Sequence, residues 1–134
     1  MAPRTTIGKI TWNEPALDYL LKNPAGPVGR DLSKRGNKVL AAARIQVGVK
    51  TEDLKKSLKV THERSVRGQF VKVGSTTVKY ALAHHEGTRP HIITPKRAQV
   101  MVFESKGSVI YANRVEHPGT KANRYLSDNL YLAL

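Results

Sequence analysis

The stretch from residue 28 to residue 47 carries apolar side chains at spacings near three and four, the pattern of one face of an α-helix. The residues on this face are Val28, Leu32, Val39, Ala43 and Val47. Lysine and arginine side chains occupy other faces, and Gly48 provides a C-terminal stop. A helix of this kind depends on tertiary packing of its apolar face. The rest of the chain must therefore supply a covering surface.

Two shorter helical segments flank this helix. Asn13 is in position to cap a helix that ends near Pro24. Thr51 is in position to cap a single turn, from which Leu54 and Leu58 would point inward together. These segments and the long helix place the helical part of the chain at about residues 13–57.

Two segments show the apolar alternation and the turn residues of β-hairpins. The first spans residues 58–73 around the Arg67-Gly68 breaker, and the second spans residues 98–115 around the turn Lys106-Gly107. Residues 78–85 lie between them and predict a short helix, although the segment is too short for its periodicity to decide. The sheet part is expected at about residues 58–117.

The C-terminal segment predicts a helix at about residues 121–133. Leu126, Leu130 and Leu134 recur every four residues, and Thr120 or Asn123 is in position to cap the helix. The order of elements predicts an α+β fold with N-terminal helices, an antiparallel β-sheet built from hairpins and a C-terminal helix. With 134 residues and 14.8 kDa, the chain fits a single domain over residues 1–134.

Several function classes lack the residues they need. The chain has no cysteine, which excludes disulfides, zinc-thiolate sites and thiol nucleophiles. We find no G-x-S-x-G elbow and no Walker or Rossmann phosphate loop, and therefore expect neither an enzyme nor a cofactor. The chain starts without an apolar signal region and has no run of 18 apolar residues, so we expect a soluble protein without membrane contact.

The formal net charge of +13 favours polyanionic partners such as nucleic acid or acidic protein surfaces. The basic residues are spread along both halves of the chain and form no tail. The aromatic residues are not interleaved with them in the way that is typical of nucleic-acid-binding motifs. A basic nucleic-acid-binding module therefore stays a rival interpretation, beside an ordinary solvated or partner-facing surface.

The stretch "YALAHHEGTRPH" at residues 80–91 contains metal-ligand residue types. A zincin helix needs H-E-x-x-H, and here His85-Glu86 is followed by no second histidine at that spacing. The adjacent histidines His84 and His85 point in different directions on a helix or a strand, and His91 lies beyond a proline. A metal enzyme that uses these residues is the weaker hypothesis, and we expect no metal site.

A shaped turn accounts for more of the same stretch. Gly87 permits backbone angles that other residues resist, Thr88 can bond to the local backbone, and Pro90 stiffens the exit. The same pattern returns at His117-Pro118-Gly119-Thr120. Two matching Gly-Thr turns therefore flank the second hairpin.

Three motifs in order resemble the tail-completion, or head-tail joining, proteins of bacteriophages with long non-contractile tails. A threonine-leucine-serine pattern of that family is matched by Thr51, Leu54 and Ser57. A tyrosine-alanine pair before an E-G-T turn is matched by Tyr80, Ala81, Glu86, Gly87 and Thr88, and the following "RPHIITPK" is similar to members from phages of actinobacteria. An H-P-G-T turn before an aromatic-leucine pair is matched by His117, Pro118, Gly119, Thr120, Tyr125 and Leu126. Glu52 and Arg124 depart from the usual glycine and proline.

The resemblance implies a subunit of a ring in the virion, at the junction between head and tail, with a fold like that of tail terminators and with no catalysis. Its partners would be copies of itself, the neighbouring neck or connector and tail-tube proteins, and DNA passing through the lumen. Such a protein is made in the cytoplasm of the host bacterium. A tail terminator that caps tail-tube polymerisation is the nearest alternative.

We expect the two Gly-Thr turns to be shaped turns and three basic residues to form a contact surface. The basic residues are Arg89, Lys96 and Arg97. Ordinary solvation is the alternative for these three side chains. Hairpin edges would let a neighbour extend the sheet and close a ring.

Overall fold

The long helix predicted from apolar spacing is present as α2 (Pro27–Gln46) in a computed structural model that describes residues 8–48 and 52–134. Gly48 follows its end with a φ of +77°. Val39, Ala43 and Val47 of the predicted face are buried, and Leu40 is buried beside them. This confirms both the helix and its apolar side.

Two short helices accompany α2 where the sequence places them. In α1 (Glu14–Lys22) the Asn13 side chain accepts a hydrogen bond of 3.2 Å from the backbone N–H of Ala16, which confirms the predicted N-cap. In α3 (Glu52–Ser57), Leu54 is buried, and Leu58 directly after the helix is buried beside it. Thr51, the proposed cap of this turn, lies outside the described residues.

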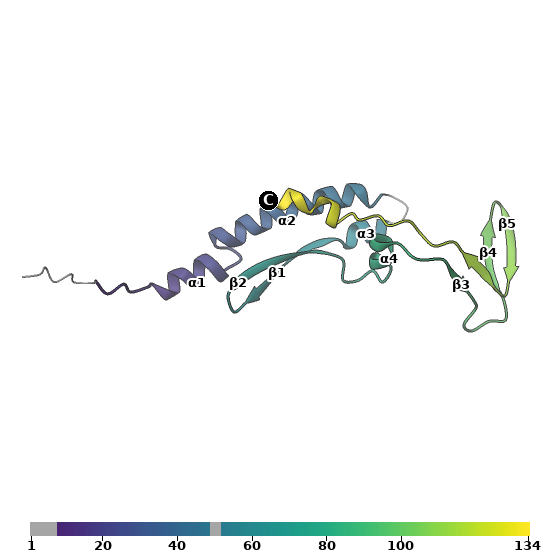
Figure 1. Ribbon diagram of the computed structural model, residues 1–134, viewed down its shortest axis with the longest axis horizontal. Helices are drawn as coiled ribbons and strands as arrows, with labels where there is room; N and C mark the ends of the chain where they lie inside the picture. Colours follow the sequence, from purple (N-terminus) through teal and green to yellow (C-terminus); the bar gives the residue numbers. More distant parts are fainter. Residues whose placement is uncertain (1–7, 49–51) are drawn as a thin grey trace, which may run out of the picture.

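The first hairpin packs on α2 and closes the core from below in Figure 1. Strand β1 (Lys59–Ser65) pairs antiparallel with β2 (Gly68–Gly74), and the turn between them is Val66-Arg67, one residue earlier than predicted. Val60 and Val73 are direct partners in the ladder and pack against the buried cluster. The hairpin therefore supplies the covering surface that α2 requires.

The chain beyond this hairpin leaves the packed region and returns to it. The short helix α4 (Ala81–Glu86) is present, as predicted. The remaining strands are β3 (His91–Ile93), β4 (Met101–Ser105), β5 (Ser108–Ala112) and β6 (Val115–His117). Figure 1 shows them projecting away from the helices, with β4 and β5 at the far end. We call residues 89–119 the arm, and the helices α1–α4, the 3-10 helix described below and the first hairpin together the body.

The α+β fold is confirmed, but the strands of residues 8–48 and 52–134 form three separate two-stranded ladders in place of one sheet. The second hairpin pairs β4 with β5, and its Lys106-Gly107 turn is the predicted one, with positive φ at both residues. The pairing of β3 with β6 was not predicted. The ladders stay separate because the first hairpin lies against α2 whereas the second lies at the far end of the arm.

The predicted C-terminal α-helix at about 121–133 is wrong in both its start and its type. The structure has a shorter 3-10 helix, η1 (Ser127–Ala133). Thr120 and Asn123 cap no helix here, because their backbone groups are paired elsewhere: Thr120 with Thr88, and the Asn123 N–H with the carbonyl of His84 at 3.1 Å. These hydrogen bonds hold Thr120 against Thr88 and Asn123 against His84, and the 3-10 helix starts only at Ser127.

The buried core is small for a chain of this length. Among the described residues, the buried apolar side chains are Val39, Leu40, Ala43, Val47, Leu54, Leu58, Ala81 and Tyr125. The accessible surface is 11,076 Å², whereas a compact monomer of this mass exposes about 7,000 Å². No helix in the described ranges is both long and apolar enough to cross a membrane.

Replacing Leu54 by alanine tests this core. Leu54 is 1% exposed in α3, and truncation of a buried leucine costs about 2–5 kcal/mol through lost apolar contact and a cavity. Leu82→Ala in α4 is the matched control, since Leu82 is 72% exposed and its truncation should change the free energy of unfolding by about 0.5 kcal/mol or less. Urea denaturation measures both, and equal effects would contradict the assigned core.

Candidate functional site

The two Gly-Thr turns, which are 32 residues apart in the sequence, meet at the base of the arm. The Thr88 N–H donates to the Thr120 carbonyl at 3.0 Å, and the Thr120 N–H donates to the Thr88 carbonyl at 3.1 Å. The two hydroxyl oxygens also lie 3.0 Å apart, within hydrogen-bond distance. We call this arrangement the Gly-Thr bridge. It ties the outgoing and returning chains of the arm together where they leave the body.

Glycine is required at both turns by backbone angle and by space. Gly87 has a φ of +75° and Gly119 a φ of +86°, a region that L side chains rarely adopt. A Cβ on Gly87 would lie 2.6 Å from the Thr120 carbonyl oxygen, and one on Gly119 would lie 2.2 Å from that of Thr88. Each glycine therefore allows the opposite strand to approach, and the predicted shaped turns are confirmed.

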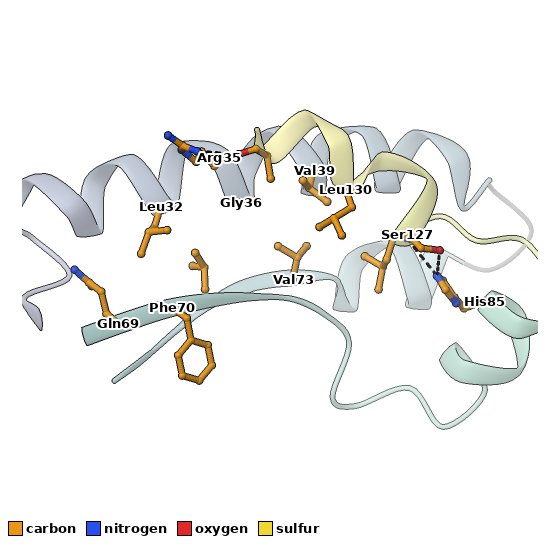
Figure 2. Close-up of a pocket in the computed structure, with 13 residues that line it drawn as sticks. Leu32, Arg35, Gly36, Val39, Gln69, Phe70, Val73, His85, Ser127 and Leu130 are labelled. Carbon is orange, nitrogen blue, oxygen red and sulfur yellow. Dashed lines mark hydrogen bonds between the residues drawn. The ribbon is translucent and has the colours of Figure 1, made fainter. Parts of the chain in front are cut away.

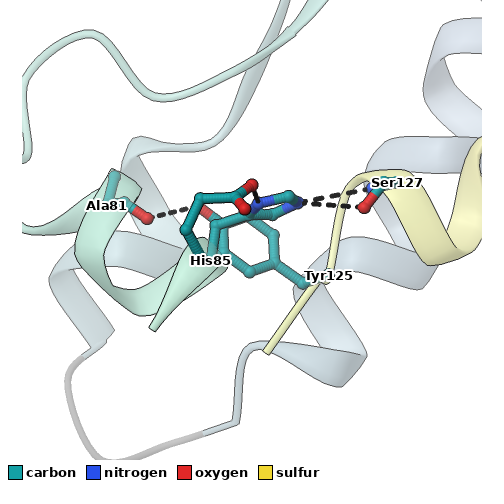
Figure 3. Close-up of polar contacts among 5 residues, drawn as sticks. Ala81, His85, Tyr125 and Ser127 are labelled. Atoms are coloured by element: carbon teal, nitrogen blue, oxygen red, sulfur yellow. Dashed lines mark hydrogen bonds and ion pairs between the residues drawn. The ribbon is translucent and has the colours of Figure 1, made fainter. Parts of the chain in front are cut away.

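The motif tyrosine Tyr125 anchors the returning chain in the core. It is 2% exposed, and its hydroxyl donates to the carbonyl of Ala81 at 3.3 Å (Figure 3). Burial raises its pKa above the ordinary value of 10.0, because a phenolate would lose its hydration there. Tyr125 thus connects the segment after the bridge to the start of α4.

The two adjacent histidines of the stretch at residues 80–91 make structural contacts. His85 donates from Nδ1 to Glu86 at 2.6 Å, and its Nε2 accepts from the Ser127 hydroxyl at 3.3 Å, which links α4 to η1 (Figure 3). His84 Nε2 lies 3.3 Å from the Asn123 amide nitrogen. Both rings also pack against the Tyr125 ring, with centroids 5.8 Å away for His84 and 5.1 Å away for His85.

The other motif histidines stack on each other in the first rung of the arm. His91 and His117 are ladder partners, and their ring centroids lie 5.0 Å apart. His117 Nδ1 accepts from the Gly119 N–H at 3.0 Å, and His91 Nδ1 donates to the Arg89 carbonyl at 2.9 Å. Over residues 8–48 and 52–134, no three metal-ligating side chains gather into a possible metal site.

The arm exposes apolar side chains on both faces of its distal hairpin. Val102, Val109 and Tyr111 are exposed on one face, and Phe103 with Ile110 on the other. A solvated two-stranded hairpin ordinarily presents one polar face, and such a hairpin by itself is marginal in water. Exposed apolar surface of this kind makes the hairpin a candidate interaction site.

The three basic residues predicted as a contact surface all lie on the arm and are exposed. Arg89 follows the Gly-Thr bridge directly, and Lys96 with Arg97 occupies the loop between β3 and β4. They do not gather with the rest of the motif residues around Tyr125. Their exposure fits contact with a partner and ordinary solvation equally well.

The remaining motif residues lie in the body or at the base of the arm. The Ser57 hydroxyl donates to the Leu54 carbonyl at 2.8 Å, and its oxygen lies 2.7 Å from the Ser75 hydroxyl oxygen, which joins α3 to the segment after β2. Tyr80 precedes α4 and is 41% exposed. Pro118 is exposed in the turn beside Gly119.

A groove between α2, β2 and η1 was missed by sequence reasoning. It has a volume of about 570 Å³ and a mainly apolar lining. Figure 2 shows Leu32 and Val39 from α2, Val73 from β2 and Leu130 from η1 around it, whereas the Phe70 ring points to the opposite side of β2. The apolar periodicity of each segment carried a signal, but only the folded chain places the three elements around one space.

Comparisons of the chain with protein-family models, with curated proteins and with solved structures found no match.

Gly119→Ala tests the bridge against a matched control, Gly107→Ala. Both glycines have a φ near +80°, but a Cβ on Gly107 meets nothing within 4 Å, whereas one on Gly119 would collide with Thr88. The control should lose only the backbone cost of about 1–2 kcal/mol. Gly119→Ala should lose more and should also deprotect the Thr88 and Thr120 amides in hydrogen-exchange NMR. Unchanged protection would show that the bridge is not specified by this contact.

Alkaline pH tests the burial of Tyr125. As pH rises through 10, tyrosine in the unfolded chain ionises before Tyr125 does in the folded chain, because burial raises the folded-state pKa. Its contribution to stability is thus complete below pH 10 and declines above it. The denaturant midpoint should fall between neutral pH and about pH 11, and Tyr125→Phe should fall less. An identical decline in both proteins would contradict this assignment.

Proposed function

We propose that this chain is a structural protein of a bacteriophage virion, which forms a homo-oligomeric ring at the head-tail junction and joins or completes the tail. The observation that carries the proposal is the projecting arm, whose distal hairpin exposes apolar side chains on both faces. An arm of this kind has its apolar surface covered only when other subunits pack against it.

The extent of exposed surface supports an assembling subunit. The accessible area exceeds that of a compact monomer of equal mass by about 4,000 Å². A standard protein interface removes about 800 Å² from each partner. The excess is therefore large enough for contacts with two neighbouring copies and with the rings above and below.

The motifs that resemble the tail-completion family lend further support, because their residues meet where the arm joins the body. Thr88 and Thr120 close the base of the arm, and Tyr125 fastens the returning chain to Ala81. A rigid base would fix the direction in which an arm meets its neighbour. The proposed role is mechanical and includes no catalytic step.

Two alternatives remain open to test. A tail terminator would use the same arm and ring to stop growth of the tail tube. The formal net charge of +13 favours contact with DNA in the lumen, or a separate nucleic-acid-binding role. Tight DNA binding that persists at physiological salt would support that second role, whereas binding that salt abolishes would reflect charge alone.

Electron microscopy of lysates from the encoding phage with this gene deleted tests the proposed function. Filled heads beside detached tails of normal length are expected for a joining protein, and complementation with the wild-type gene should restore whole particles. Overlong tails would instead identify a terminator. Intact infectious particles without the gene would overturn the virion role.

A further inference from the structure

We propose that the distal hairpin β4–β5 of one copy occupies the apolar groove of the next copy. This inference rests on the proposed function, because it names the contact that would build the ring. The groove and the hairpin are two different apolar surfaces of one chain, and a single contact between copies would remove both from water.

The groove is open to an apolar occupant. Leu130 on η1 is 63% exposed and borders the space, opposite the half-buried Val73 of β2 (Figure 2). At the rim, Arg35 donates to the carbonyl of Ala133 at 3.2 Å and so holds the end of η1 beside α2. Three elements therefore fix the shape of the groove before any partner binds.

The ladder register identifies the face of the hairpin that enters it. Val102 is the direct partner of Tyr111, and Val109 lies two residues from Tyr111 on the same face. These three side chains are 59–70% exposed, whereas Phe103 and Ile110 on the opposite face are each 38% exposed. The three apolar side chains of the more exposed face have more surface to bury, and this face, which also carries Glu104 opposite Val109, is the one we assign to the groove.

A second copy is the occupant because the chain's own hairpin points away. In Figure 1 the hairpin lies at the far end of the arm, on the opposite side of α4 from the groove elements α2, β2 and η1. The Gly-Thr bridge and the β3–β6 ladder hold the arm in this direction.

The exposed area of a subunit is large enough for two such contacts, one with each neighbouring copy. Two standard interfaces remove about 1,600 Å² from a subunit, well within its excess of about 4,000 Å² over a compact monomer. A hairpin-to-groove contact joins unlike surfaces, so each copy can give its hairpin to one neighbour and accept that of another. Contacts of this type close into rings when the rotation between copies allows it.

Cysteine cross-linking tests the contact, and the absence of native cysteine gives a clean background. Val109→Cys places a thiol on the hairpin and Leu130→Cys one in the groove, both at exposed positions where substitution leaves folding intact. The two purified full-length variants are mixed and treated with a short bismaleimide. Circular dichroism checks that each variant folds like the wild type. Ile45→Cys replaces Leu130→Cys in the control mixture, since Ile45 is 81% exposed on α2 and does not line the groove.

A cross-linked dimer in the Val109→Cys and Leu130→Cys mixture is expected, at several times the yield of the control mixture or of either variant alone. Preferential linking of Val109→Cys to itself would overturn the inference in favour of hairpin-to-hairpin contact. A small apolar molecule found in the groove by native mass spectrometry, or equal yields in all mixtures, would also overturn it.

The outcomes separate this contact from the virion role. Oligomers that form without the 109–130 product would overturn the inference and leave the ring proposal standing. The 109–130 product together with intact particles from the gene-deleted phage would support the contact and overturn the virion role.

Discussion

The hydrogen bonds between Thr88 and Thr120 join the outgoing and returning chains of the arm where they leave the body. They close the arm at its base, and they hold the chain extended as it returns to the body. The bridge exists because Gly87 and Gly119 leave room for the opposite carbonyl. Its effect reaches the core, since the returning segment carries Tyr125, the bulkiest of the fully buried side chains among the described residues. One short pairing therefore sets both the direction of the arm and the completion of the core.

Because the core is small and the arm is long and apolar, much of the apolar surface that could stabilise the chain stays exposed. Burial of apolar surface is the main favourable term in folding and in association. In the proposed ring, a chain that leaves much of this surface exposed would transfer that term to contacts between subunits. The groove between α2, β2 and η1 and the distal hairpin are the two places where this transfer would be largest. The basic surface has a secondary role in stability, because exposed charges on flexible side chains contribute little to it.

Several features could be predicted from the sequence because they depend on neighbouring residues alone. The Asn13 cap, the burial of Leu54 and Leu58, and the turn at Lys106-Gly107 follow from local hydrogen bonding, periodicity and backbone freedom. The C-terminal helix failed for a tertiary reason. Leucines at every fourth position favour a helix, but the backbone of Thr120 already pairs with Thr88, and the Asn123 N–H with the His84 carbonyl. Local preference gave way to hydrogen bonds made across the fold.

The sequence by itself determined the helices α1 and α2, both hairpins and the two Gly-Thr turns, since each is encoded within a short window of residues. Only the tertiary structure decided that the two turns pair, that the strands form three ladders, and that the groove exists. These features join segments far apart in the chain, and no local pattern states which segment meets which. Their physical cause is the satisfaction of backbone hydrogen bonds and the covering of apolar faces by the chain as a whole.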